Sequence, residues 1–310
     1  MIILKLPDEL QFIANGRKTQ KRTSAKMDGK TCLISGSSSG VGLAAAKRIA
    51  KAGANLVLIC RNPVKASAIK EEIGKQYGVI VDTVIADFSD FSQVRHAAFQ
   101  ILEKYDKIDV LVNSVGVHNN YRELNSDGIE MVFCVNHLAQ FLLTRLLVDR
   151  IIESAPARIL FVNSEGHRFG GLDINDLNWN KRRYSGFQSY GASKIAQLLT
   201  VWEMAEQITE TGVTVNAMHP GGVKTNIGMN NGFIYRFYQN FILSPFLSSP
   251  EISGEAIYYL VADPEMAKFS GKFFNQTIEE KAARYALDRV MGKKVWEISE
   301  KLTGLDNQEK

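Results

Sequence analysis

Short apolar runs alternate along most of the chain with longer runs that have the spacing of helices. The apolar runs have the length and composition of strands, which are predicted at residues 31–35, 54–60, 79–86, 108–112, 158–162 and 213–218. Helices are predicted between them, at residues 43–52, 63–77, 91–105, 125–153 and 190–207. This alternation is typical of a parallel sheet with helices on both faces. We therefore expect a single doubly wound α/β domain, a Rossmann fold of about seven strands.

A glycine-rich loop joins the first predicted strand to the first predicted helix. Its sequence is Gly36-Ser37-Ser38-Ser39-Gly40-Val41-Gly42. A strand, a glycine loop and a helix in this order predict a phosphate site, because glycine lets the backbone approach phosphates and the helix amides face them. An ordinary tight turn is the alternative. We expect a dinucleotide to contact Gly36, Ser38, Ser39, Gly40, Val41 and Gly42.

The residues after the next three strands bear on the choice of cofactor. An NAD enzyme usually carries Asp or Glu after its second strand, whereas this chain has Cys60-Arg61-Asn62. The guanidinium of Arg61 favours the 2′-phosphate of NADP, unless Arg61 is only a solvated loop residue. Asp87, followed by Phe88, ends the third strand and can accept from the adenine amine. The fourth strand runs into Asn113-Ser114-Val115-Gly116.

Two residues four apart carry the candidate proton chemistry. Tyr190 and Lys194 are expected one turn apart on one face of a helix. An ammonium beside a phenol favours the phenolate, so such a phenol can exchange a proton near neutral pH. Many surface helices have the same spacing, and the spacing alone is therefore weak. Ser164 strengthens the interpretation because it ends the fifth strand, and open α/β sheets bind ligands at that end.

Composition and charge limit the class of protein. The 310 residues are 45% hydrophobic and 23% charged, which fits one large domain or a domain with an appendage. Cys32, Cys60 and Cys134 lie far apart without metal-ligand spacing, so we expect buried thiols, no metal site and a reducing, cytoplasmic compartment. The chain lacks an uninterrupted run of about 18 apolar residues, so we expect no transmembrane helix. We also expect no nucleic-acid binding.

Taken together, the motifs resemble the short-chain dehydrogenase/reductase family, in its compact single-domain branch. They occur in the family's order and approximate spacing over residues 29–277: the glycine loop, Asp87, Asn113 to Gly116, Asn136, Ser164, Tyr190-x-x-x-Lys194 and Pro220-Gly221. One motif departs, because the family usually has Asn-Asn-Ala-Gly where this chain has Asn113-Ser114-Val115-Gly116. We expect its backbone role to survive, since Asn113 and Gly116 are kept.

Within the family, the chain is most similar to the retinol dehydrogenase and WW-domain oxidoreductase type, without a WW domain. The similarity lies in the segments Asn136 to Thr144, Ser164-x-x-His167, His219-Pro220-Gly221, Ser249-Pro250-Glu251 and Ser270 to Phe274. It implies an NADP(H)-dependent oxidoreductase that interconverts a carbonyl and an alcohol on a lipophilic substrate, such as a retinoid, a steroid or a fatty aldehyde. The alternatives are a carbon–carbon double-bond reductase similar to protochlorophyllide reductase and a regulatory protein that binds NADP.

The resemblance also implies a role for each matching residue. Tyr190 would be the general acid in reduction and the base in oxidation, and Lys194 would lower its pKa and bind the nicotinamide ribose. Ser164 would hydrogen-bond the substrate oxygen. Asn136 would hold a water that links Lys194 to solvent, or would only bond backbone inside the fold. Further cofactor contacts are expected from Phe88, Asn113, Ser114, Val115, Gly116, Tyr190, Pro220, Gly221, Val223 and Thr225. His118, His167 and His219 are expected nearby without an acid–base role.

Three parts of the chain are expected: an N-terminal extension (1–28), the catalytic domain (29–277) and a C-terminal helical extension (278–310). Residues 225–249, rich in apolar and aromatic side chains, are expected to form a helical substrate lid. This lid and the basic run at 17–22 leave peripheral membrane contact open, although a solvated arm or burial of the lid against the N-terminal extension would explain them too. Family members often pair through the helices near Asp127 and Tyr190, which implies a homo-oligomer.

Overall fold

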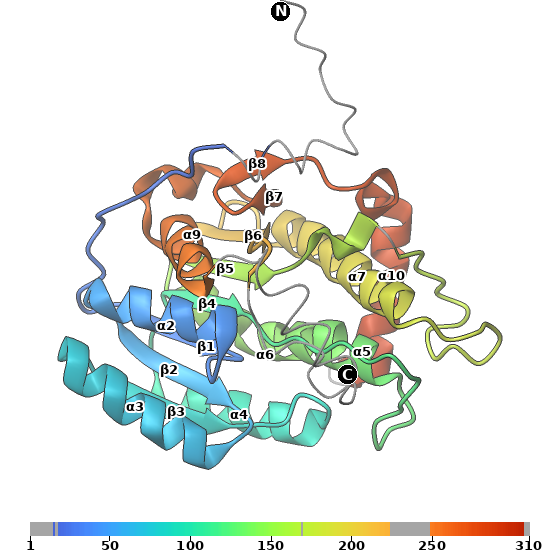
Figure 1. The fold of residues 1–310 in the computed structure, drawn as a ribbon, viewed down its shortest axis with the longest axis horizontal. Coiled ribbons are helices and arrows are strands. Elements are labelled where there is room, and N and C mark those ends of the chain that lie inside the picture. Colours follow the sequence, from blue (N-terminus) through green and yellow to red (C-terminus); the bar gives the residue numbers. More distant parts are fainter. Residues whose placement is uncertain (1–14, 16–17, 169, 224–248, 307–310) are drawn as a thin grey trace, which may run out of the picture.

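The structure, a computed structural model, describes residue 15 and residues 18–168, 170–223 and 249–306 (Figure 1). Their strands form one sheet of eight in the order β3-β2-β1-β4-β5-β6-β7-β8, all parallel to their neighbours except β8. The bounds are Thr31–Ser35 (β1), Asn55–Cys60 (β2), Val81–Ile85 (β3), Val110–Asn113 (β4), Ala157–Val162 (β5), Val213–His219 (β6), Lys272–Asn275 (β7) and Ile278–Glu280 (β8). The strand order reverses between β1 and β4, where doubly wound sheets bind ligands.

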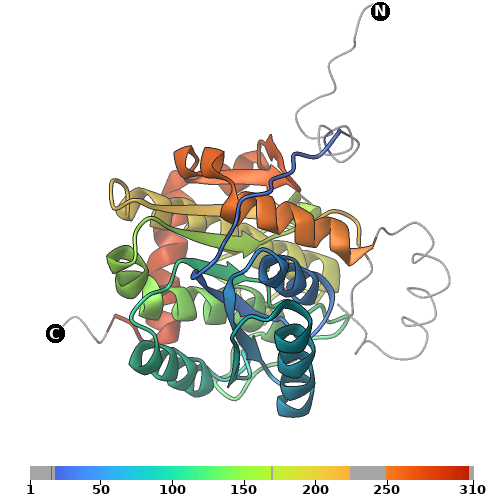
Figure 2. The ribbon, with the colours of Figure 1, turned by 90° about the vertical axis from the view of Figure 1, so that its left-hand side faces the viewer.

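Helices cover both faces of this sheet, as Figures 1 and 2 show. One face carries α2 (Gly40–Lys51), α3 (Pro63–Tyr77) and α9 (Pro250–Ala262), and the other carries α4 (Phe91–Lys104), α6 (Ala139–Glu153) and α7 (Gly186–Gln207). The helix α10 (Arg289–Thr303) packs against α7 and α6. Because each face has its own apolar core, the central strands are buried on both sides. The predicted doubly wound α/β fold is confirmed.

Local signals in the sequence explain why several elements begin and end where predicted. The strand β1 has the predicted bounds, and so does α3. The side chain of Asn62 caps α3 by accepting from the amide of Lys65, Pro63 occupies its first position, and Gly78 ends it with φ 69°. In contrast, α7 begins at Gly186, four residues before the predicted start at Tyr190, with Ser185 as its N-cap residue.

The predicted helix at 125–153 begins later than expected. The helical part starts with the short α5 (Met131–Phe133), continues through a π-helical turn, η2 (Cys134–Leu138), and only then becomes α6. Residues before it form a turn in which the side chain of Asn125 accepts from the amides of Asp127 and Ile129. The prediction was wrong here because an Asn side chain that bonds nearby amides favours a turn over a helix. Asn136 therefore lies in the π-helical turn.

The eighth strand exceeds the expected number of about seven. It is short, with the sequence Ile-Glu-Glu, and it pairs with β7 after a tight turn at Gln276, whose φ is 54°. The division of the chain into three parts stays a prediction, but its boundary after residue 277 falls inside this β7–β8 hairpin. Short 3₁₀ turns, η3 (Glu165–Arg168), η6 (Pro264–Lys268) and η7 (Arg284–Leu287), complete the described elements.

The described part of the N-terminal extension lies along the body of the domain. The amide of Lys21 donates to Thr277 Oγ1 at 2.8 Å, and the hydroxyl of Tyr258 donates to the carbonyl of Ala25. Met27 is buried, and its amide donates to the carbonyl of Ala52 at 2.8 Å. Within the basic run, Lys21 also pairs with Glu265 at 3.0 Å, while Lys18 and Arg22 are exposed.

One described helix, Met131–Glu153, is long and apolar enough to span a membrane by length and composition. Most of its most apolar stretch (83%) is buried inside the fold, where it contributes to the core between the sheet and α10. A core helix passes the same test, and we interpret this one as a core helix. The expectation of no transmembrane helix therefore stays a prediction for the chain as a whole.

Candidate active site

The glycine loop folds tightly on itself at the end of β1. Gly36 has φ 68°, and a Cβ there would lie 2.8 Å from the carbonyl oxygen of Ser114. A Cβ on Gly42 would lie 2.4 Å from the carbonyl oxygen of Gly36. Glycine is therefore required at both positions. The next helix, α2, starts at Gly40 after Ser39, whose side chain makes no capping hydrogen bond. A helix start without a side-chain cap, beside a glycine loop, suits a phosphate.

The predicted adenosine side of the site lies at the ends of β2 and β3. Arg61 and Asp87 follow these strands, and their side chains form a loose ion pair with 3.8 Å between Nη1 and Oδ2. The Arg61 side chain is 71% exposed, so it can reach a further anion. Asp87 also accepts from the amide and hydroxyl of Ser89, and Phe88 is buried. The structure thus brings these predicted cofactor residues together at one edge.

The segment after β4 packs between the glycine loop and the helices. The amide of Ser114 donates to Ser35 Oγ at 3.1 Å, and the carbonyl of Val115 accepts from Gln140 Nε2 at 2.9 Å. Asn113 donates to Thr144 Oγ1, but its own side-chain oxygen is buried without a hydrogen-bond partner. Ser114, Val115 and Gly116 are half-buried. The cradle of glycines and this unpaired acceptor fit a bound dinucleotide, which can bring donors of its own.

Lys194 and Tyr190 lie one turn apart on α7, as predicted. The Lys194 side chain is buried, and Nζ donates to the carbonyl of Val162 at 2.9 Å. The same Nζ is 5.8 Å from the centre of the Tyr190 ring. Burial lowers the pKa of Lys194 to about 7. At 5.8 Å from the ring, the amine in its protonated form is close enough for its charge to act on the phenol.

Ser164 and Tyr190 meet around Gly166. The amide of Gly166 donates to Ser164 Oγ at 3.0 Å. A Cβ on Gly166 would lie 2.8 Å from Cε1 of Tyr190 and 3.3 Å from Ser164 Oγ. Glycine at this position thus lets the serine and the tyrosine approach each other. Gly166 was not among the predicted site residues, although its place two residues after the strand-end serine was a signal.

Asn136 is fully buried, and its side chain is occupied by protein groups. Oδ1 accepts from the amide of Val117 at 2.8 Å, and Nδ2 donates to the carbonyl of Val117 at 3.0 Å and to Ser193 Oγ at 3.1 Å. This is the backbone-bonding role that the sequence left as an alternative. Its carbonyl faces Gln140 and Gln197, which both donate to it. The water-holding role stays a prediction.

The segment after β6 approaches the same end of the sheet. The carbonyl of Pro220 accepts from Ser253 Oγ at 2.7 Å, and Val223 is buried. Gly221 has φ 91°, and a Cβ there would lie 2.5 Å from Nε2 of Gln276. Thr225 and all of the predicted lid except its last residue, 249, lie outside the described residues.

The three histidines named from the sequence lie near Ser164 and Tyr190. The ring of His118 is 5.8 Å from the ring of Tyr190, edge-on. His167 contacts the carbonyl of Ser164 through Nδ1, and His219 Nδ1 accepts from the amide of Glu165. Burial lowers the pKa of His167 to about 4 and that of His219 to about 3. Both are therefore neutral at physiological pH, which agrees with a structural rather than an acid–base role.

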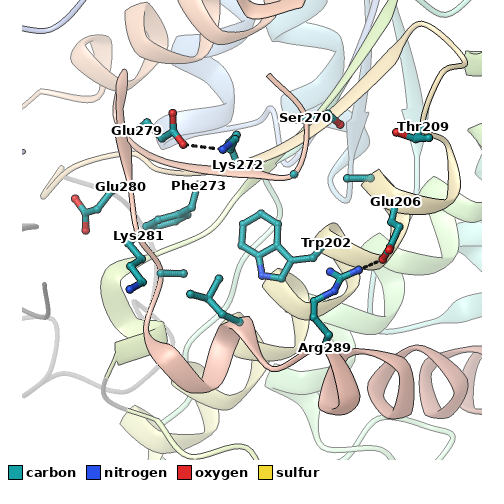
Figure 3. Close-up of a pocket in the computed structure, with 14 residues that line it drawn as sticks. Trp202, Glu206, Thr209, Ser270, Lys272, Phe273, Glu279, Glu280, Lys281 and Arg289 are labelled. Carbon is teal, nitrogen blue, oxygen red and sulfur yellow. Dashed lines mark hydrogen bonds and ion pairs between the residues drawn. The ribbon is translucent and has the colours of Figure 1, made fainter. Parts of the chain in front are cut away.

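A separate hollow of about 790 Å³ lies between α7, β7, β8 and the start of α10 (Figure 3). Trp202 and Phe273 line its floor, and its rim carries the ion pair Lys272–Glu279. It contains none of the predicted site residues and lies near the amino end of β7. The predicted site residues gather at the opposite, carboxyl ends of the strands, so this hollow is distinct from the candidate active site.

Comparisons with known proteins agree with this geometry. Residues 30–232 match the family model described as short chain dehydrogenase. Retinol dehydrogenase 13 of Homo sapiens is 34% identical over 289 residues, covering 92% of this chain and 87% of that protein. Retinol dehydrogenase 14 of Homo sapiens is 33% identical over 295 residues, covering 90% of this chain and 88% of that protein.

Solved structures share the fold. A dehydrogenase/reductase from Sinorhizobium meliloti superposes with a TM-score of 0.64 at 26% identity, covering 81% of this chain and 94% of its own. L-Sorbose reductase from Gluconobacter frateurii, solved with NADPH and L-sorbose, superposes with a TM-score of 0.66 at 22% identity, covering 84% of this chain and 100% of its own. At that identity the second likeness shows the fold alone. The chain belongs to the short-chain dehydrogenase/reductase family of oxidoreductases, and retinol dehydrogenases are among its relatives.

Proposed function

We propose that this chain is an NADP(H)-dependent oxidoreductase that interconverts a carbonyl and an alcohol on a lipophilic substrate, retinoid-, steroid- or fatty-aldehyde-like. The observation that carries the proposal is the convergence of Ser164 and Tyr190 on Gly166, with the Lys194 amine 5.8 Å from the Tyr190 ring. These are the family's proton-transfer residues at the matching positions. The relatives named as retinol dehydrogenases support the lipophilic substrate.

Each residue has a chemical task in this mechanism. A bound nicotinamide cofactor supplies the hydride in reduction or takes it in oxidation. Tyr190 gives its phenolic proton to the substrate oxygen in reduction and takes it back in oxidation. Ser164 Oγ accepts from the Gly166 amide, which leaves its hydroxyl hydrogen to donate to the substrate oxygen. That hydrogen bond stabilises the negative charge that develops there.

Lys194 adjusts the pKa of the Tyr190 phenol in this mechanism. Its amine is held by the carbonyl of Val162 and is shielded from water. In its charged form it stabilises the phenolate of Tyr190. Burial works against that charged form, and this is why the pKa of Lys194 falls to about 7. The anionic phosphates of a cofactor would favour the ammonium again, so we expect the charge on Lys194 to increase with cofactor binding.

The preference for NADP(H) rests on Arg61. No carboxylate stands directly after β2, where the sequence is Cys60-Arg61-Asn62. Arg61 is largely exposed and makes one ion pair of 3.8 Å, to Asp87. A guanidinium in that position can bind a 2′-phosphate through two parallel hydrogen bonds. We therefore place Arg61 on the 2′-phosphate and Asp87 nearer the adenine.

Assembly and location belong to the same proposal. We expect a cytoplasmic homo-oligomer, and peripheral membrane contact through the predicted lid or the basic run at 17–22 stays open. The pairing surface would differ from the one expected from sequence, because α10 covers the outer side of α6 and α7. Trp296 of α10 packs edge-on against Phe141 with ring centres 4.9 Å apart, and Glu300 pairs with Arg145 at 2.6 Å. A second copy would need another face.

The deciding experiment uses Tyr190→Phe. Purified wild type and variant are titrated with NADPH and NADH, and NADPH oxidation is followed with carbonyls graded by chain length and ring count. We expect the variant to bind NADPH normally and to lose about 10²–10⁴-fold in turnover, since only the proton donor is missing. Tyr184→Phe is the matched control, because that phenol hydrogen-bonds Glu130 at 3.0 Å outside the proposed proton path. Substantial turnover by Tyr190→Phe would refute the assignment.

A further inference from the structure

A buried cluster of charged side chains lies directly behind the turn that carries Ser164. It consists of Glu165 and Arg168 on η3 and Glu280 on β8. Arg168 Nε lies 2.5 Å from Glu165 Oε2, and Arg168 Nη2 lies 2.5 Å from Glu280 Oε1. The side chains are only 9%, 7% and 1% exposed, in that order. Charges this deeply buried are rare and costly to desolvate even when they are paired, as they are here.

Glu280 is held on both of its oxygens. Oε1 bonds Arg168, and Oε2 accepts from Asn15 Nδ2 at 2.9 Å and from Asn275 Nδ2 at 3.2 Å. Its neighbour Glu279 faces the other way and pairs with Lys272 on the rim of the hollow in Figure 3. The short strand β8 thus directs one specific carboxylate into the fold. Asn15 brings the N-terminal extension to the same point.

The negative charge in the cluster is not fully compensated. Two carboxylates share one guanidinium, and one oxygen of Glu165 is buried without a hydrogen-bond partner. Burial, followed by the charge of Glu280, raises the pKa of Glu165 above its ordinary value. A purely stabilising contact would be better served by apolar residues of the same size. The cluster therefore fits a requirement for geometry rather than for stability.

The geometry in question is that of the Ser164 turn. The carbonyl of Ser164 accepts from the amide of His167 at 3.2 Å and contacts Nδ1 of the same residue at 2.7 Å. His167 is in turn fixed by the segment after β8, because Nε2 accepts from the amide of Ala283 and the hydroxyl of Tyr285 donates to its carbonyl. Arg168 also donates to the carbonyl of Lys281 at 2.9 Å. Contacts from residues 280–285 therefore hold the η3 turn in place.

We propose that Glu280 and Arg168 are positioning residues that hold the Ser164 hydroxyl in place to hydrogen-bond the substrate oxygen, and that Asn15 links the N-terminal extension to this network. Neither residue needs to touch substrate or cofactor. The proposal rests on the proposed role of Ser164, but it makes a separate claim about what keeps that serine in place. Loss of the buried charge at Glu280 would remove one of the two carboxylates that pair with Arg168, and would thereby loosen the η3 turn.

The test compares Glu280→Gln with Glu279→Gln, a matched control one residue away on the same strand, whose side chain is 47% exposed. Amide hydrogen exchange is measured by mass spectrometry on a peptide that contains Gly166 and His167, whose amides bond to Ser164. We expect Glu280→Gln to speed this exchange about tenfold or more. We also expect about a tenfold lower kcat with the NADPH dissociation constant and KM within about twofold of wild type. Glu279→Gln should match wild type.

The possible outcomes separate cleanly. Unchanged exchange in Glu280→Gln would overturn the proposal, and faster exchange with unchanged kcat would overturn the positioning role. A wild type that reduces no carbonyl would defeat the proposed function, while the exchange data would still decide whether Glu280 holds the turn. Asn15→Ala, which removes one hydrogen bond to Glu280, gives the same test if Glu280→Gln does not fold. We expect a smaller, about two- to fivefold, increase in exchange, and no increase would refute the link to the N-terminal extension.

Discussion

Replacement of the buried Lys194 by Met should change how the stability of the protein depends on pH. Lys194 is 2% exposed, and burial lowers the pKa of its amine from the ordinary value of 10.5 to about 7. In the unfolded chain the same amine stays protonated up to about pH 10.5. Between these two values the unfolded state binds one more proton than the folded state. The free energy of unfolding of the wild type therefore rises with pH across this window because of Lys194.

The size of this effect follows from the two pKa values. Each pH unit well inside the window is worth about 1.4 kcal/mol, but the folded amine is still half protonated at pH 7. The contribution of Lys194 to the free energy of unfolding should therefore rise by about 2.3 kcal/mol between pH 7 and pH 9. Met has a similar length and no charge, so this contribution disappears in Lys194→Met. The variant also leaves the carbonyl of Val162 without its donor, which costs about 1–3 kcal/mol at every pH. The slope with pH, not the absolute difference, tests the argument.

Urea unfolding of wild type and variant without cofactor, at pH 7, 8 and 9, supplies the measurement. Subtracting the two curves removes the groups that titrate in both proteins. Lys65→Met, which removes an exposed lysine from α3, gives the background for the loss of one positive charge. We expect the free energy of unfolding of wild type minus that of Lys194→Met to rise with pH. A difference that stays constant from pH 7 to pH 9 would mean that the folded protein keeps Lys194 charged, and the account of its burial would be wrong.

Three further predictions follow from the site and its surroundings. Arg61→Asp should weaken NADPH relative to NADH by about 1.5–3 kcal/mol, about ten- to a hundredfold in the ratio of dissociation constants, and an unchanged ratio would mean that Arg61 does not meet the phosphate. Gly36→Ala should lower the free energy of unfolding by about 1–2 kcal/mol and abolish tight NADPH binding, because φ is 68° and the new Cβ would meet the Ser114 carbonyl. Gly171→Ala, with open space around it, is the control and should leave both properties nearly unchanged. Trp296→Ala should cost about 3–5 kcal/mol in urea unfolding because its ring packs inside the core against Phe141, and a loss below about 1 kcal/mol would contradict that packing.

Elements with strong end signals could be predicted from the sequence almost residue by residue. The helix α3 is an example, because Asn62, Pro63 and Gly78 mark its two ends. The start of the helix before Asn136 could not be predicted in this way. Its apolar period continues through a π-helical turn, and Asn125 bonds local amides instead of starting a helix. Periodicity alone does not distinguish these cases.

The site shows the same division. Tyr190, Lys194 and Ser164 were found because their residue types are tied to a chemistry and their spacing to a fold. Gly166 was missed because a glycine carries no chemistry of its own, and its importance appears only when the ring of Tyr190 is placed 2.8 Å from its would-be Cβ. Glu280 was missed for the opposite reason. A sequence of Ile-Glu-Glu suggests a solvated strand edge, and only the pairing register shows which of its two acids turns inward.

Segments outside the matched family region make contacts that support the candidate active site. The family model matches residues 30–232, yet the turn that holds Ser164 is gripped by residues 280–285 and, through Glu280, reaches back to Asn15. The helix with Tyr190 is supported in the same way, since Trp202 near its end donates to the carbonyl of Ala286. The turn that carries Ser164 and the helix that carries Tyr190 thus both depend on chain that follows the matched region. A fragment cut at residue 277 would keep every residue singled out for catalysis and lose the contacts that hold two of them, so we expect it to be inactive even where it folds.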